Sequence, residues 1–147
     1  MVEEARQRPN ADAWFGRDIQ GYDIYARCIY GARASILVGL LATILTTTIG
    51  GAVGIFSGYA GGWTDSILSR LGDIFFAIPL LLGAVIVLVS LPETDNYYLI
   101  VLKVVLALVV LGWPSMARLM RSSVIQVKPN DYVHAARALG ASPWRVI

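Results

Sequence analysis

The sequence is short of the residues that most redox and metal sites need. Its 147 residues include one cysteine, Cys28, and one histidine, His134. A single cysteine forms neither an intrachain disulfide nor a CxxC redox pair, and together with one histidine it does not supply the four ligands of a structural zinc site. We therefore expect no metal site and no disulfide-based chemistry.

Charge is scarce as well. Charged residues make up 15% of the chain, and the 12 basic residues are spread out and leave a formal net charge of only +2. This pattern does not favour nucleic acid as a partner. The sequence has no Gly-Lys pair, which excludes the GxxxxGK[ST] loop that cradles nucleotide phosphates. His134 has no serine or cysteine in a nucleophile pattern, so we predict neither catalytic nor cofactor-binding residues.

Apolar residues, in contrast, are abundant. They make up 56% of the chain, and the mean hydropathy is +0.63. A soluble domain of this length does not have the interior to bury so much apolar surface, so the composition indicates a membrane protein. Residues 1–13 are polar and of mixed charge, without the basic start and apolar core of a cleaved signal peptide.

Three apolar segments predict three transmembrane helices, and the expected fold class is an all-α membrane protein. Residues 34–60 contain no charge, and about 20 residues of helix cross ~30 Å of hydrocarbon. We place the spans at about 34–58, 67–91 and 98–118. Lys103 is the one charge inside the third span, and we expect its stem to carry the ammonium back to the headgroups rather than toward a substrate.

Orientation follows weakly from charge. The leading segment, residues 1–33, and the tail from residue 118 each carry five basic residues, but the leading segment also carries five acidic residues and the tail only Asp131. We therefore expect residues 1–33 to be extracytoplasmic and residues 119–147 to be cytoplasmic.

Small residues and prolines mark features within the spans. Gly50, Gly54 and Gly58 form two overlapping GxxxG steps, which predict a face for close helix packing. Pro79 is expected to bend the second helix and Pro114 to loosen or kink the third.

Two polar features lie where the first two spans meet. Asp65 follows a glycine-rich turn and is expected to cap the second helix. Arg70 and Asp73, three residues apart, are expected to form an ion pair that anchors the helix near the membrane edge, rather than to act in gating or subunit contact.

The tail is predicted to contain a second kind of structure. Asn130 or Asp131 is suited to cap a short alanine-rich helix, Gly140 to end it, and Ser142-Pro143 to begin another, which gives two short helices meeting at an elbow. Helical spacing places a small-residue ridge on one face of the first of these helices, suited to a partner groove. This ridge consists of Tyr132, Ala135, Ala136 and Leu139.

At these residues the sequence resembles the permease subunit of binding-protein-dependent ABC importers. His134-Ala135-Ala136-Arg137-Ala138-Leu139-Gly140 matches the spacing of that family's E-A-A, three residues, G pattern. Three further segments resemble its dipeptide, oligopeptide and nickel branch in the same order, namely GRDIQGYDIYARCIYGARASILVG, YAGGWTDSILSRLGDIFFAIP and WPSMARLMRS. His134 replaces the usual Glu, and the leading segment has Arg17 and Tyr22 where the family has Thr and Arg.

The resemblance implies a six-helix permease, of which this chain covers helices two to four and a truncated coupling loop. It implies that the chain lines part of a path and pairs with a second permease subunit, two ATPase subunits that bind ATP and Mg, and an extracytoplasmic substrate-binding protein. It also implies that ATPase coupling lies in one short segment, at Tyr132, His134, Ala135, Ala136, Arg137, Leu139 and Gly140.

Two other functions also fit the spans. A small multispan channel or part of a secondary transporter is compatible with bent helices and a lysine inside a span, but it does not account for the tail. A structural scaffold that packs through its glycines would tolerate changes at Ala135 or Gly140, whereas a permease would lose coupling.

Overall fold

The computed structural model describes residues 6–146 and divides the chain into two compact units, residues 1–40 and 41–147. The first five residues of the predicted leading segment and Ile147 of the predicted tail lie outside the described residues. The described residues contain no strand, only one isolated bridge between Arg17 and Asp23. The predicted all-α fold class is therefore confirmed. The helices are α1 (Ile24–Ala60), α2 (Gly62–Phe76), α3 (Leu80–Ser90), α4 (Tyr97–Val127), α5 (Asp131–Ala138) and α6 (Pro143–Val146).

In the first unit, a hydrogen-bonded loop precedes α1. The carboxylate of Asp18 accepts the backbone N–H groups of Gln20 and Tyr22 at 2.8 and 3.0 Å and pairs with the guanidinium of Arg27. Lost hydration alone would raise the pKa of this carboxyl, but the two backbone hydrogen bonds and Arg27 outweigh it and hold the pKa below 3.8. Asp23 accepts the N–H of Tyr25 at 2.9 Å and so caps the start of α1.

The helix α1 begins ten residues before the predicted first span. It has 37 residues, against the ~20 that a bilayer requires. The sequence prediction counted only residues without charge, whereas Asp23 starts the helix outside that run. A helix and its membrane-embedded part thus have different boundaries.

The second predicted span is not one helix. The structure ends α2 at Phe76 and starts α3 at Leu80, and the two helix axes differ in direction by 91°. Pro79 is the N-cap residue of α3, with φ −57° and ψ 127°. Proline disfavours helical geometry at the residue before it and cannot donate a backbone hydrogen bond, so the chain breaks where a bend within one helix was expected.

The third predicted span lies within α4, which is longer at its C-terminal end. Asn96 caps it by accepting the N–H groups of Tyr98 and Leu99, and the helix then continues to Val127. Pro114 is buried inside α4 and does not end it. The ammonium of Lys103 donates to the carbonyl of Pro92 in the preceding loop, so this side chain extends toward the helix start as the snorkelling hypothesis requires.

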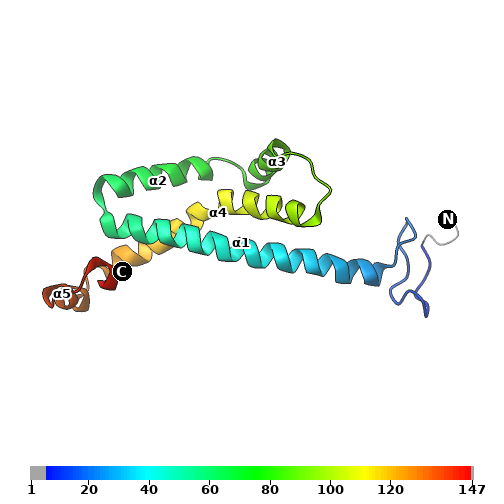
Figure 1. Ribbon diagram of the computed structural model, residues 1–147, viewed down its shortest axis with the longest axis horizontal. Helices are drawn as coiled ribbons and strands as arrows, with labels where there is room; N and C mark the ends of the chain where they lie inside the picture. The colour runs from blue at the N-terminus through cyan, green and yellow to red at the C-terminus, as the bar shows by residue number, and fades with distance from the viewer. Residues whose placement is uncertain (1–5, 147) are drawn as a thin grey trace. The chain divides into compact units, whose positions relative to one another are not determined.

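Two helices, α1 and α4, are long and apolar enough to cross a membrane, and the bent pair of α2 and α3 makes a third span if it is counted as one. Within residues 41–147, α4 passes the C-terminal part of α1 and leads to α5 close to the end of α1 (Figure 1). Gly50, Gly54 and Gly58 meet successive turns of α4 in ascending order, so the two helices run in the same direction along this contact. This arrangement brings their C-terminal ends together.

Candidate coupling site

The elbow, which we define as residues 128–146, is built by well-formed helix ends. Asn130 is the N-cap residue of α5, and its carbonyl accepts the N–H of His134 at 3.2 Å. Asp131 in the first turn and Arg137 in the last turn both suit the helix dipole. At the other end Gly140 has φ +81° and donates to the carbonyl of Arg137 at 3.0 Å. A left-handed residue closes a helix in this way at little cost only when it is glycine.

The elbow carries exposed apolar side chains on both of its helices. Tyr132 is 63% exposed, Leu139 is 89% exposed, and Trp144 of α6 is 90% exposed. Ala135 is exposed on the same face and Ala136 is half-buried. We call the set Tyr132, Ala135, Leu139 and Trp144 the crest. Large apolar side chains grouped in this way are typical of a surface that another protein covers.

The opposite side of α5 packs against the end of α1. Val133 is buried, and it lines a hollow of about 210 Å³ together with Tyr59 and Arg137. The guanidinium of Arg137 lies 5.5 Å from the centre of the Tyr59 ring. Arg137, expected among the ATPase-coupling residues, therefore also makes a contact within the chain.

His134 lies neither in the crest nor in the hollow that Val133 lines. It is exposed and lines an open hollow together with Lys128, Arg137 and Asp65. The described residues contain no group of three or more His, Cys, Asp or Glu that would hold a metal ion, so His134 has no such set around it there.

Ion pairs join α2 to α4 beside the elbow, and they differ from those expected. Asp65 does not cap α2, which begins at Gly62; its carboxylate instead accepts the Nη2 of Arg121 at 2.6 Å and the hydroxyl of Ser57 at 2.5 Å. Asp73 pairs with Arg118 at 2.8 Å and not with Arg70. The spacing of three residues brought Arg70 and Asp73 to one side of α2, but packing against α4 supplied a closer cation.

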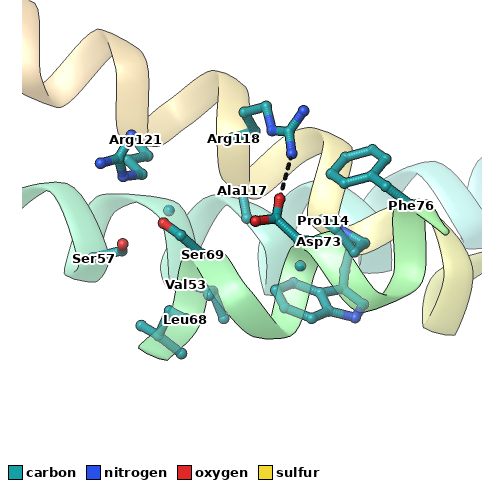
Figure 2. Close-up of a pocket in the computed structure, with 13 residues that line it drawn as sticks. Val53, Ser57, Leu68, Ser69, Asp73, Phe76, Pro114, Ala117, Arg118 and Arg121 are labelled. Atoms are coloured by element: carbon teal, nitrogen blue, oxygen red, sulfur yellow. Dashed lines mark hydrogen bonds and ion pairs between the residues drawn. The ribbon is translucent and has the colours of Figure 1, made fainter. Parts of the chain in front are cut away.

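A cavity of about 300 Å³ lies between α1, α2 and α4 (Figure 2). Figure 2 shows the Asp73–Arg118 pair at this cavity, with Phe76 close to Arg118. The guanidinium of Arg118 lies 4.0 Å from the centre of the Phe76 ring. The lining residues are Val53, Gly54, Ser57, Leu68, Ser69, Gly72, Asp73, Phe76, Trp113, Pro114, Ala117, Arg118 and Arg121.

The expected packing residues face α4. A Cβ atom added to Gly50 would lie 2.6 Å from the carbonyl oxygen of Trp113. A Cβ atom added to Gly54 would lie 2.3 Å from the carbonyl oxygen of Ala117. At Gly58 the nearest atom, the Cβ of Val124, would be 3.0 Å away. The backbones approach so closely that glycine is needed at the first two positions.

Four residues of the site were not predicted. Val133 is next to the predicted ridge but not part of it, and Trp144 follows the ridge in the sequence. Tyr59 and Lys128 were missed because their hydrogen bond joins residues 69 positions apart. A signal for Val133 was present, because it is the one aliphatic residue of α5 larger than alanine.

Comparisons with known proteins identify the family of this chain. Residues 50–147 match the family model described as the binding-protein-dependent transport system inner membrane component. The oligopeptide transport system permease protein of Bacillus subtilis is 39% identical over 143 residues, which cover 97% of this chain and 45% of that protein. The dipeptide transport system permease protein of the same organism is 37% identical over 99% of this chain and 44% of its own length.

A glutathione transport system permease protein of Pectobacterium atrosepticum is 30% identical over 99% of this chain and 46% of its own length. The chain thus spans less than half the length of these relatives. The family match extends over both α4 and the whole described elbow. The chain therefore belongs to the family of binding-protein-dependent transport system inner membrane components, and it is a multi-pass protein of the inner membrane.

Proposed function

We propose that the chain is part of the permease subunit of an ABC importer and forms part of the translocation path for peptides or related small solutes. The family match and the relatives, which are named as oligopeptide, dipeptide and glutathione transport system permeases, support this function. The helices contribute little charge to a path, which suits substrates selected elsewhere by a binding protein.

In this proposal, the crest is the surface through which the permease is coupled to an ATPase subunit. An element that transmits force from one subunit to another must be rigid and must offer a surface to its partner. The elbow has both properties, because the left-handed Gly140 that closes α5 and the buried Val133 fix it while Leu139 and Trp144 stay exposed. We propose that an ATPase subunit binds this crest.

The remaining partners follow from the same proposal. A second permease subunit completes the path, two ATPase subunits bind ATP and Mg and hydrolyse the nucleotide, and an extracytoplasmic protein delivers the substrate. The chain itself is non-catalytic in this scheme and binds no cofactor.

Placing a charge in the crest tests the docking. In the full-length protein co-expressed with its ATPase subunits, Ala135→Glu is expected to reduce the amount of ATPase that co-purifies by at least about tenfold, because an unpaired charge would be buried in the interface. Substrate uptake is expected to fall in parallel. The matched control is Ala138→Glu, which introduces the same charge on α5 outside the crest. Retention of ATPase and full uptake in the Ala135→Glu protein would reject the assignment.

The proposed orientation has a direct test in Cys28, which is exposed near the start of α1. If residues 1–33 are extracytoplasmic, a membrane-impermeant maleimide should label Cys28 in right-side-out vesicles. In a Cys28→Ser protein, Ala138→Cys should be labelled only after the vesicles are permeabilised. The reverse pattern would place the elbow outside the cell, out of reach of any ATPase.

A further inference from the structure

The end of α1 is tied to the joint between α4 and α5. Tyr59 belongs to the last turn of α1, where backbone carbonyls have no partner within the helix. The ammonium of Lys128, the C-cap residue of α4, donates to the Tyr59 carbonyl at 2.7 Å. A cation at this position both satisfies the carbonyl and complements the negative end of the helix dipole.

The Tyr59 ring adds a second link. The Nζ atom of Lys128 lies 5.6 Å from its centre, and the Cζ atom of Arg137 lies 5.5 Å from it. Both distances are within the ~6 Å over which a cation is attracted by an aromatic face. We call residues 128–130, between α4 and α5, the joint. Lys128 caps the end of α4 and Arg137 belongs to α5, so cations from both ends of the joint lie at one ring.

Among residues 6–146, no acidic side chain competes with the Tyr59 ring for these cations. In the described part of the chain, neither Lys128 nor Arg137 makes an ion pair with a carboxylate. Val133, which is only 6% exposed, lines the same hollow as Tyr59. The side of α5 that faces away from the crest is therefore fixed to α1 at the Tyr59 side chain.

We propose that Tyr59 is the positioning residue through which a displacement of α5 is passed to α1. The joint of residues 128–130 is short and contains Pro129, and without a second attachment it would let α5 pivot when the crest is pushed. With the ring attracted to both cations, α5 and the end of α1 move together. This inference rests on the proposed function, in which an ATPase pushes the crest.

The test measures coupling rather than assembly. Full-length importer is reconstituted in liposomes, and peptide uptake per ATP hydrolysed is measured for Tyr59→Leu, Tyr59→Phe and the unchanged protein. Tyr59→Leu is expected to keep its ATPase subunits and its ATP hydrolysis but to transport about tenfold less peptide per ATP, because both cation–ring contacts are lost. Tyr59→Phe keeps the ring and is expected to restore the ratio.

Trp63→Leu is the matched control, since it removes an 86% exposed aromatic ring at the start of α2, four residues after Tyr59. Its transport per ATP should match that of the unchanged protein. If Tyr59→Leu does not accumulate, Arg137→Gln, which alters an exposed side chain, should lower the ratio about threefold through the loss of one contact.

The possible results separate the two proposals. An unchanged ratio in Tyr59→Leu, or an equal loss in Tyr59→Phe or Trp63→Leu, overturns the role of the ring. Loss of the ATPase subunits from Tyr59→Leu also overturns it, because Tyr59 would then act in docking. If the unchanged protein itself retains no ATPase, the proposed function fails instead.

Discussion

Replacing Gly54 with alanine is expected to force α1 away from α4 and to destabilise the protein by about 1–3 kcal/mol. The added Cβ would lie 2.3 Å from the carbonyl oxygen of Ala117, closer than any real contact of this kind. Backbone cannot move aside as a flexible side chain can, so the helices themselves must separate. Alanine is the better helix former by about 1 kcal/mol, and an observed loss would therefore understate the clash.

The neighbouring glycines give a graded series for this prediction. The effect of alanine should decrease from Gly54 to Gly50 to Gly58, as the nearest atom recedes from 2.3 to 2.6 to 3.0 Å. Gly51 is the matched control, because its added Cβ would meet only Met120, at 4.0 Å. The measurement is the fraction of full-length protein that stays monodisperse after heating in detergent. Equal stability of the Gly54 and Gly51 variants would contradict the packing account.

The glycine stripe illustrates how far the sequence leads. Spacing of four residues identified Gly50, Gly54 and Gly58 as one face, because that spacing follows from helix geometry alone. It did not identify α4 as the partner. The pairing of α1 with α4 is between helices that are separated in the sequence by α2 and α3. No local sequence pattern encodes such a pairing.

The spans were predictable for a related reason. The cost of placing charge in hydrocarbon restricts a span to a charge-free run, and α1 and α4 contain the predicted first and third spans. The ends of the helices were not predictable from charge, because a capping residue such as Asp23 starts a helix wherever it lies, inside the bilayer or outside. Pro79 was correctly expected to disturb the second helix, but the size of the change, a 91° break, depends on the surrounding packing.

At the elbow, local rules gave α5 and its glycine end, since a left-handed residue acts within a few positions. Asn130 is the N-cap residue as expected, but its side chain makes no capping hydrogen bond. The division of α5 into an exposed crest and an inward face was only partly predicted. Ring contacts of Lys128 and Arg137 depend on Tyr59, which is distant in sequence. The predicted Arg70–Asp73 pair was wrong for the same reason, because Asp73 pairs with the distant Arg118 instead.

The second large effect is expected at the pair of Asp65 and Arg121. Asp65→Asn should destabilise the full-length protein by about 2–3 kcal/mol, because hydrogen bonds to a charged group contribute that much and the arginine loses its counter-ion. The side chains are 18% and 35% exposed, so water only partly replaces the lost carboxylate. The same heating assay measures the change.

The double variant shows whether the loss belongs to the pair. Arg121→Met alone leaves an unpaired carboxylate, but Asp65→Asn combined with Arg121→Met removes both charges and should cost clearly less than the sum of the single changes. Asp73→Asn is the control from the same two helices. Its ion pair with Arg118 has both side chains 61% exposed, and an exposed pair contributes only about 0–1 kcal/mol. If Asp73→Asn were as damaging as Asp65→Asn, burial would not be what makes the Asp65–Arg121 pair strong.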